Sequence, residues 1–254
     1  MRPSNRKVVT RSPSKTVRVL NLNGALPGPV ECESTLERDF VLRAALHPAV
    51  VNIEHQPFQL DLPDGRSYTP DFLLHMRHDR CIVVEVKVKS RIQAYRSTFE
   101  LATKYLHDRG YDFTVADDTL VRCDRTHRRA ARILRYLKGG FAANGCQRVL
   151  QIANSTPSTV SIGTLIAAAD ISLELVLHLV AQRRLLLDEH LSLELSAKVR
   201  PAQLCSTACT ASDFYRVMGM RPWDVPDAPD RTHDRSADLR PLIGDGRLSA
   251  STPR

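Results

Sequence analysis

The most constraining feature of the sequence is an apolar run, residues 81–88, that carries two charged side chains. The run reads Cys-Ile-Val-Val-Glu-Val-Lys-Val, and most of its residues are β-branched. Such a run is typical of a strand at the buried centre of a sheet. Burying Glu85 and Lys87 costs free energy unless they are paired or hold a metal ion. The run therefore predicts a layered fold with a reason to keep charge inside it.

The segments around this run alternate between helical and strand patterns. Ser34 is a predicted N-cap with Glu37 at the third helical position, and His47-Pro48 ends that helix. A second helix is predicted over 91–109, with Gly110 after its end. Strands are predicted over 50–53, 58–62, 72–74, 81–88 and 111–116, with a further one after the turn at 63–65. This order predicts an α/β fold, a mixed sheet flanked by helices.

Charge is unevenly distributed along the chain. Lys and Arg number 36 against 28 Asp and Glu, a net charge of +8 that favours nucleic acid or an anionic surface as partner. Residues 1–30 hold 6 basic residues and no acid, 31–127 hold 13 and 16, 128–220 hold 11 and 6, and 221–254 hold 6 of each. We expect a mobile basic arm over 1–30, whose deletion weakens DNA binding more than folding, and an extended or disordered tail over 221–254.

The cysteines and the hydropathy point to a location inside the cell. The 6 cysteines are scattered without a CxxC pair, which is typical of a reduced protein. Cys205 and Cys209 lie four apart, but no second ligand pair accompanies them, so a structural metal there is not expected. No stretch reaches the ~18 apolar residues of a membrane span, and the basic N-terminus lacks the apolar core of a signal peptide. We expect a cytoplasmic protein.

Two carboxylates and a lysine are expected to converge at one end of the sheet. Side chains alternate along a strand, so Glu85 and Lys87 share a face. If the hairpin closes through a loop at 77–79, Asp71 lies across from Glu85, whereas a slip of one residue moves it to the other face. Carboxylate oxygens are the ligands that Mg²⁺ prefers, and a bound Mg²⁺ assists phosphodiester hydrolysis. Predicted metal ligands are Asp71, Glu85, the backbone carbonyl of Val86 and Glu37.

Each of these residues also has a purely structural interpretation. A Pro-Asp followed 14 residues later by Glu-x-Lys is a loose pattern. Glu85 and Lys87 could form only an ion pair within the sheet, and Glu37 could only cap its helix. In the catalytic interpretation Lys87 acts on the attacking water, through an ammonium that orients it or offsets charge on the phosphoryl group. Lys89 is expected to be solvated or to touch a phosphate.

The ordered set of motifs resembles the N-terminal domain of TnsA, the endonuclease subunit of heteromeric cut-and-paste transposons. The resemblance covers about residues 31–120 and rests on Glu33-Ser34-x-x-Glu37-x-Asp39-Phe40, Gln56-Pro57-Phe58, Tyr68-Thr69-Pro70-Asp71-Phe72-Leu73, Val84-Glu85-Val86-Lys87 and Arg109-Gly110-Tyr111-Asp112-Phe113. It implies a restriction-endonuclease-like PD-(D/E)xK fold. It also implies that Glu37, Asp71 and Lys87 are catalytic, and that Glu85 fills a position where some members carry Gln.

The same resemblance implies a function and partners. The family subunit cuts the 5′ ends of the transposon with Mg²⁺, for which Mn²⁺ may substitute. Its partners are the double-stranded transposon ends, a DDE-type transposase of RNase H-like fold that cuts and joins the 3′ ends, and an AAA+ ATPase regulator. A bacterial, DNA-associated location follows from the resemblance. Two alternatives stay open: a stand-alone restriction or repair endonuclease of the same fold, and a non-catalytic DNA-binding adaptor.

The second half of the chain predicts a smaller helical module over 128–220. A helix that places Arg128, Arg132 and Arg135 on one face suits a DNA backbone or plain solvent. Helices over 161–169 and, capped by Ser172, over 173–184 precede an expected hairpin of 185–187 with 191–195, which together predict a winged helix. The exposed face expected for the last helix, Glu174, His178 and Gln182, is poor for reading bases, so protein docking or backbone contact is favoured.

The sequence thus predicts four parts and a set of DNA contacts. The parts are an arm (1–30), a PD-(D/E)xK nuclease domain (31–127), a winged-helix-like domain (128–220) and a tail (221–254). The predicted DNA contacts are Arg2, Arg6, Lys7, Arg11, Lys15, Lys89, Arg128, Arg132 and Arg135.

Overall fold

The computed structural model describes residues 1–3, 17–78, 80–156, 158–202 and 210–224. Its helices are α1 Thr35–Ala44, α2 Lys89–Ile92, α3 Arg96–His107, α4 Asp118–Val121, α5 Thr126–Leu134, α6 Ala143–Ser155, α7 Ile162–Ala169, α8 Leu173–Ala181 and α9 Ala211–Met218, with short 3-10 turns η1 Gln93–Tyr95 and η2 Cys123–Arg125. Its strands are β1 Arg2–Pro3, β2 Arg18–Leu20, β3 Val30–Cys32, β4 Val50–His55, β5 Phe58–Asp61, β6 Ser67–Tyr68, β7 Phe72–Met76, β8 Cys81–Lys87, β9 Asp112–Asp117, β10 Val160–Ser161, β11 Leu185–Leu187 and β12 Lys198–Pro201.

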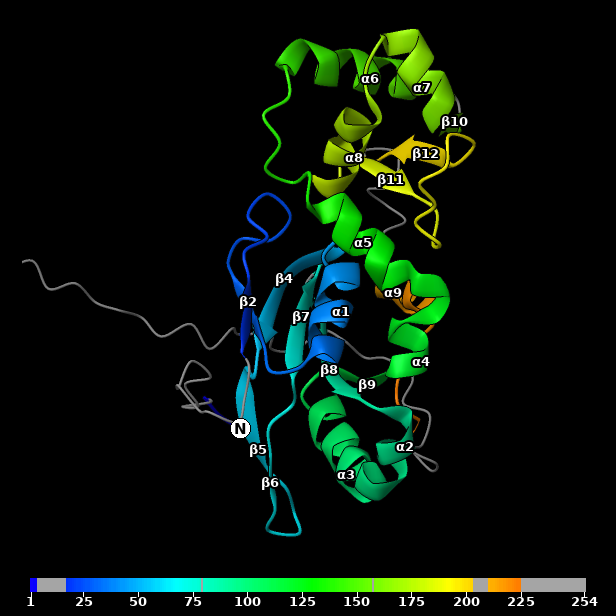
Figure 1. The fold of residues 1–254 in the computed structure, drawn as a ribbon. Coiled ribbons are helices and arrows are strands. Elements are labelled where there is room, and N and C mark those ends of the chain that lie inside the picture. The colour runs from blue at the N-terminus through cyan, green and yellow to red at the C-terminus, as the bar shows by residue number, and fades with distance from the viewer. Residues whose placement is uncertain (4–16, 79, 157, 203–209, 225–254) are drawn as a thin grey trace, which may run out of the picture.

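The central sheet is mixed and flanked by helices, as the sequence predicts. Its four strands are ordered β4-β7-β8-β9, with β8 antiparallel to β7 and parallel to β9, so the apolar run is an interior strand. The parallel pair requires a crossover, which α2 and α3 supply. Even-numbered residues of β8 join a core cluster with α1, and Val83 on the other face joins a second cluster with α3. Figure 1 shows α1 and α3 beside this sheet.

The hairpin of β7 and β8 has the expected register. Phe72 pairs with Val84 and Leu74 with Ile82, and the Met76 N–H donates to the Arg80 carbonyl at 2.8 Å. In every pair the two residue numbers sum to 156, so one more step places Asp71 opposite Glu85. The loop therefore spans 77–79, as predicted, and Asp71 and Glu85 lie on the same face of the sheet.

The predicted helix over 91–109 is interrupted. The chain forms α2 and η1 first, and Tyr95 leaves helical geometry at φ −108° and ψ 4° before α3 begins. The α2 turn buries no residue, whereas α3 buries Phe99, Ala102 and Leu106 along one face, so packing sustains only the second part. Gly110 follows α3 with φ +80°, the left-handed geometry that glycine adopts readily after a helix.

The expectation of a mobile arm is wrong for the second half of residues 1–30. Residues 18–20 form β2 against β3, and Leu22, Ala25, Leu26 and Val30 are buried in the core cluster that contains α1. Deleting residues 1–30 would remove this core as well as the basic residues. Arg6, Lys7, Arg11 and Lys15 lie outside the described residues, so only a deletion that stops before residue 17 tests them separately.

The C-terminal segment folds in the order α6-β10-α7-α8-β11-β12, with a small sheet ordered β10-β12-β11. The expected hairpin of 185–187 with 191–195 is wrong, because β11 pairs with 198–201 instead. The helix predicted over 173–184 ends at Ala181, and Arg183 has a left-handed φ of +58°. This turn directs the Arg183 guanidinium to the carbonyls of Val50 and Ala25 in the first half of the chain.

Helix α8 has little surface. Its residues from Leu175 to Ala181 are all buried, including His178, which was expected to be exposed. The His178 ring lies 4.9 Å from that of Phe141, and its Nδ1 lies 2.7 Å from the Tyr136 carbonyl oxygen. Within the described ranges no single helix is long and apolar enough to cross a membrane, and the apolar pair α7–α8 is bent by 117°.

The start of the predicted tail packs against the central sheet. Thr114 Oγ1 donates to the Arg221 carbonyl at 2.6 Å, and the Trp223 N–H donates to the Phe113 carbonyl at 2.8 Å. The Trp223 ring meets that of Phe99 edge to face. An unpredicted helix, α9, precedes this segment and is capped by Thr210. Residues 225–254 of the predicted tail, like Cys205 and Cys209, lie outside the described part of the chain.

Candidate active site

Asp71, Glu85 and Lys87 converge at the end of β7 and β8. Asp71 directly precedes β7, and its Oδ2 accepts the Val86 N–H at 2.8 Å. Glu85 is 3% exposed, and its Oε1 lies 2.5 Å from Lys87 Nζ. Its other oxygen, Oε2, accepts the hydroxyl of Tyr68 at 2.8 Å. The strand pairing that the sequence predicts therefore places these three side chains in one group.

Glu37 belongs to this group through its charge, although half of its carboxylate serves as a helix cap. Ser34 is the N-cap of α1, and its Oγ accepts the Glu37 N–H at 3.0 Å. Glu37 Oε2 in turn accepts the Glu33 N–H at 2.7 Å, one residue before the position expected for a capping box. The Glu37 charge also raises the pKa of Asp71 and of Glu85. Glu37 thus both caps α1 and acts on the group.

The carboxylates disfavour one another's ionisation. Burial raises the pKa of Asp71 well above its ordinary value, and the charges of Glu85 and Glu37 raise it further. Burial also raises the pKa of Glu85, despite the opposing effect of Lys87 and of the Tyr68 hydroxyl. Negative charge is therefore incompletely compensated at this end of the sheet.

Lys87 remains an ammonium in this setting. Burial alone lowers the pKa of Lys87, but Glu85 outweighs that effect through its charge and hydrogen bond, so the pKa is raised. The Nζ atom also lies 4.7 Å from the centre of the Tyr95 ring, whose face attracts a cation. Lys87 is thus set to donate a hydrogen bond rather than to accept a proton.

The residues present fit a divalent cation that completes its coordination with water and substrate. Over the described residues, no group of three or more His, Cys, Asp or Glu side chains is arranged to hold a metal ion by itself. Mg²⁺ commonly uses only one or two carboxylates together with waters and phosphate oxygens. Asp71 and Glu85 supply two carboxylates, and burial, followed for Asp71 by the charges of Glu85 and Glu37, raises their pKa values.

Two tyrosines at the site received no role from the sequence. Tyr68 supports Glu85 directly, and burial, followed by the Glu85 charge, raises its pKa, so its hydroxyl stays protonated and donates. Tyr95 lies under Lys87. Tyr68 stands three residues before Asp71 in a motif that the resemblance includes, which is a usable signal. Tyr95 gives no such signal, because only the break before α3 directs its ring to Lys87.

The residues predicted to contact DNA have different surroundings. Arg128, Arg132 and Arg135 are exposed, and Ala130, Ile133, Leu134 and Leu137 are buried beneath them, as the helical periodicity predicts. Lys89 is exposed at the start of α2. Arg2 pairs with Asp61 at 2.6 Å, so its charge is partly compensated. The remaining predicted contacts, Arg6, Lys7, Arg11 and Lys15, lie in the segment that is not described.

A known protein family matches the part of the chain that forms the central sheet. Residues 47–118 match the family model of the TnsA-like endonuclease N-terminal domain. The matched range includes Asp71, Glu85 and Lys87, and Glu37 lies ten residues before it. No curated protein matches the chain. This match supports the resemblance seen in the sequence and suggests a nuclease of the Tn7 transposase family.

Proposed function

We propose that this protein is the Mg²⁺-dependent DNA endonuclease subunit of a heteromeric transposase and cuts the 5′ ends of the transposon. The observation that carries the proposal is the placement of Asp71 beside Glu85 and Lys87 at the end of paired strands, inside a domain of the TnsA-like family. Hydrolysis of the phosphodiester leaves a 5′ phosphate and a 3′ hydroxyl.

Each residue of the group has a role in this proposal. Asp71 and Glu85 hold the cation with the Val86 carbonyl, and Glu37 adds negative charge that strengthens its binding. When bound, Mg²⁺ polarises the phosphate and lowers the pKa of the attacking water. Lys87 keeps its proton and donates a hydrogen bond to the water or to a phosphoryl oxygen. Tyr68 fixes the Glu85 carboxylate, which leaves less freedom to be lost when the cation binds.

We further propose that the C-terminal segment is a winged helix that binds partners or the DNA backbone. The order of its elements, with β12 between β10 and β11, supports this assignment. The buried side chains of α8 argue against base reading by that helix. Sequence recognition then belongs to the partners, namely a DDE-type transposase and an AAA+ ATPase, while this subunit supplies the cut.

The proposal is tested by nicking of transposon-end DNA in the presence of the two partner proteins and Mg²⁺. We expect wild type and Arg148→Gln, a change at an exposed position of α6, to nick equally. Asp71→Ala and Lys87→Ala should each lose on the order of 10³-fold in rate. Equal rates in all four proteins would remove the catalytic assignment. A folded wild type that binds the DNA but leaves it intact under these conditions would favour the adaptor alternative.

A further inference from the structure

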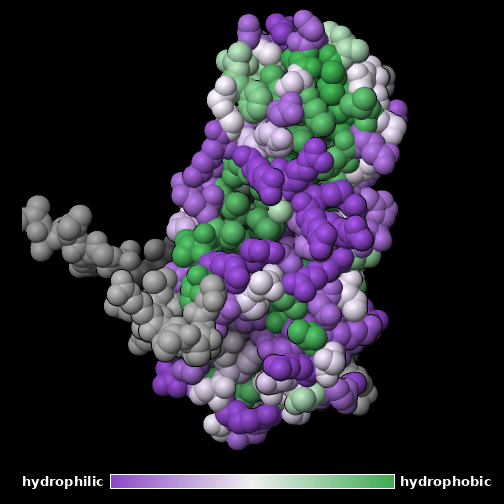
Figure 2. All heavy atoms as spheres, in the orientation of Figure 1, coloured by the Kyte–Doolittle hydropathy of each residue, from purple (hydrophilic) through white to green (hydrophobic). Residues whose placement is uncertain are grey.

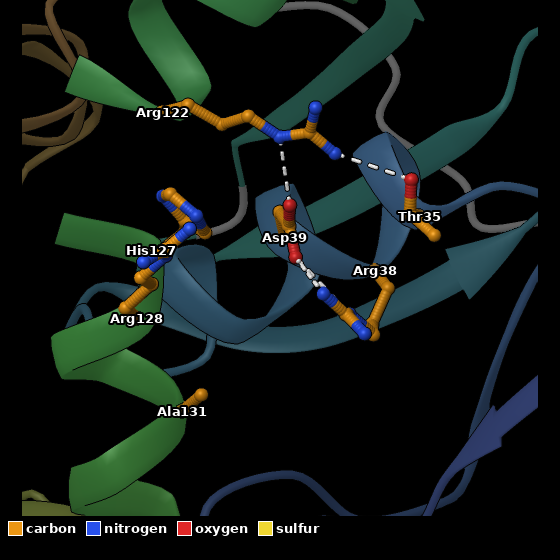
Figure 3. A pocket seen from close by; sticks show the side chains of 7 residues that line it. All are labelled: Thr35, Arg38, Asp39, Arg122, His127, Arg128 and Ala131. Atoms are coloured by element: carbon orange, nitrogen blue, oxygen red, sulfur yellow. Dashed lines mark hydrogen bonds and ion pairs between the residues drawn. The ribbon is translucent and has the colours of Figure 1, made fainter. Parts of the chain in front are cut away.

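A second site of opposite charge lies next to the active-site helix. A cavity of about 420 Å³ opens between the first turns of α1, the residue that follows α4 and the first turns of α5. Figure 3 shows its lining: Thr35, Arg38, Asp39, Arg122, His127, Arg128 and Ala131. Three arginines against one aspartate give this lining a formal charge of +2 with His127 neutral.

Asp39 fixes two of the three arginines. Its side chain is 3% exposed, and Arg38 donates to Oδ1 from Nε at 3.0 Å and from Nη2 at 2.5 Å. Arg122 Nε donates to Oδ2 at 2.8 Å, and its Nη2 donates to Thr35 Oγ1 at 3.2 Å. Both guanidiniums are thereby held on either side of the carboxylate (Figure 3). Because each is still about 40% exposed, the pair can bind an anion without rearranging.

The third arginine and the histidine complete the lining. Arg128 is exposed, and within the described residues it makes no ion pair, so its charge is uncompensated. His127 Nδ1 is buried without a hydrogen-bond partner in that part of the chain. Burial lowers the pKa of His127. The charge of Asp39 raises this pKa, and the charges of Arg122, Arg128 and Arg38 lower it. An acceptor anion would supply both the negative charge and the hydrogen-bond partner that these groups lack.

The lining favours a phosphate group over a whole nucleotide. Guanidinium forks match the oxygens of a phosphate, whereas a base needs an aromatic or apolar surface to stack on. Ala131 is the one apolar side chain among the seven residues that line the cavity. A bare phosphodiester therefore fits this chemistry better.

The position of the cavity links it to the DNA path. Arg38 directly follows Glu37 of the active-site group in α1. Arg128 begins the exposed row on α5 that continues with Arg132 and Arg135 at helical spacing. Figure 2 shows hydrophilic side chains gathered at the level of α1 and α5. A duplex backbone that follows this row reaches the cavity, which shares helix α1 with Glu37 of the proposed cutting site.

We propose that the cavity formed by Arg38, Arg122 and Arg128 around Asp39 binds a phosphate of the DNA backbone next to the scissile bond. This inference rests on the proposed function for the identity of the DNA. The bound phosphate would fix the position of the DNA strand relative to Glu37, since phosphate contacts position a protein on DNA without reading its sequence.

The test measures binding of the full chain to a random-sequence duplex by fluorescence anisotropy, without divalent cation, between about 50 and 200 mM salt. Each phosphate contact contributes about 0.9 to the slope of log K against log salt. Arg128→Gln should lower the magnitude of the slope by about that amount, and Arg148→Gln, the matched exposed arginine on α6, should leave it unchanged. Arg122→Gln should lower it too, in samples whose melting temperature shows that they are folded.

Three outcomes would overturn the inference. The first is a wild-type slope in Arg128→Gln, and the second is an equal loss of slope in Arg148→Gln. The third is tight binding of inorganic phosphate by wild type that Arg128→Gln abolishes, with the DNA slope unaltered, because the cavity would then bind free phosphate. The salt slope is measured without divalent cation, so it does not depend on cleavage. It is also measured in Asp71→Asn, which lacks a predicted metal ligand. A wild type that does not nick, with a reduced slope in Arg128→Gln, would refute the proposed function and retain the phosphate site.

Discussion

Two aspartates of this molecule, Asp39 and Asp71, have opposite electrostatic surroundings. Asp39 on α1 is almost fully buried, and both of its oxygens receive guanidinium N–H groups from Arg38 and Arg122. Asp71 receives one backbone N–H, and the charges that act on it most strongly are the carboxylates Glu85 and Glu37. The protein thus compensates the charge of Asp39 with two arginines, whereas the nearest charges around Asp71 are mainly negative.

This difference teaches what each site selects. A buried charge must be compensated, either by the protein or by a ligand. Asp39 is already compensated, so its arginines leave an excess of positive charge that an anion can meet. Around Asp71 the excess is negative, so a cation is selected. In the two proposals above, the metal ion and the DNA phosphate would each bind where the protein leaves the opposite charge uncompensated.

The largest expected effect is an opposite change in stability when each aspartate becomes an asparagine. Asp39→Asn leaves two fixed guanidiniums facing one another and should lower the free energy of unfolding by about 2 kcal/mol. Asp71→Asn relieves repulsion from Glu85 and keeps an acceptor for the Val86 N–H, so it should raise the melting temperature by a few degrees. Thermal unfolding at neutral pH without divalent cation measures both.

Asp170→Asn, at an exposed left-handed position that asparagine tolerates, is the control and should change little. Destabilisation by both Asp39→Asn and Asp71→Asn would show that the contrast between the two aspartates does not exist.

Added Mg²⁺ should sharpen the same contrast. At a concentration ten times its Kd, a ligand that binds only the folded state stabilises it by about 1.4 kcal/mol. We expect wild type and Asp170→Asn to gain melting temperature with Mg²⁺, and Asp71→Asn and Glu85→Gln to gain little. A gain that persists unchanged in both site variants would place the cation elsewhere.

The pH dependence of stability gives a further test. Because the pKa of Asp71 is raised in the folded protein, the unfolded chain loses this proton at lower pH than the folded chain does. Stability is therefore lost as pH rises from about 4 through the raised pKa. The advantage of Asp71→Asn over wild type should be small near pH 4.5 and grow toward neutral pH.

His47 acts on stability in the other direction and serves as an internal control. Burial lowers its pKa to about 4, so its contribution is lost as pH falls from about 6.5 to that value. Wild type and Asp71→Asn both lose this contribution of His47, so it cancels when the stability of one is subtracted from that of the other. A difference that does not vary with pH would argue against a raised pKa of Asp71 in the folded protein, whether burial or the neighbouring carboxylates cause it.

The smallest effect is expected from Tyr68→Phe. The change removes one hydroxyl that donates to Glu85 and keeps the ring among Phe99 and Phe113. We expect a loss of about 1 kcal/mol in stability and a several-fold lower nicking rate at limiting Mg²⁺, with less loss at saturating Mg²⁺. Tyr105→Phe, at a half-buried tyrosine of α3 whose hydroxyl accepts a hydrogen bond from the N-terminal amine, is the control. An equal loss at both Mg²⁺ levels would mean that Tyr68 does not act through cation binding.

Prediction from the sequence succeeded where local patterns carry the information. The β-branched run fixed β8 as an interior strand, and the three-residue loop fixed the register that brings Asp71 to Glu85. Helical periodicity likewise separated the exposed arginines of α5 from its buried face.

Prediction failed where tertiary contacts override the local sequence pattern. Residues 17–30 look like the end of a basic arm because they follow five basic residues and contain two prolines and two glycines, yet Leu22 and Leu26 are buried in the same core cluster as α1. Strand β11 pairs with β12 and not with the nearer apolar segment 191–195.

The sequence by itself determined which residues meet across the hairpin, because strand alternation and loop length act over short distances. The tertiary structure alone decided how each charge is compensated. Arg38, Asp39 and Arg122 are separated by up to 84 positions, and no local rule brings the last of them to the first two. Only the packing of α1 against α4 and α5 brings two arginines to one carboxylate and a third arginine into the same cavity.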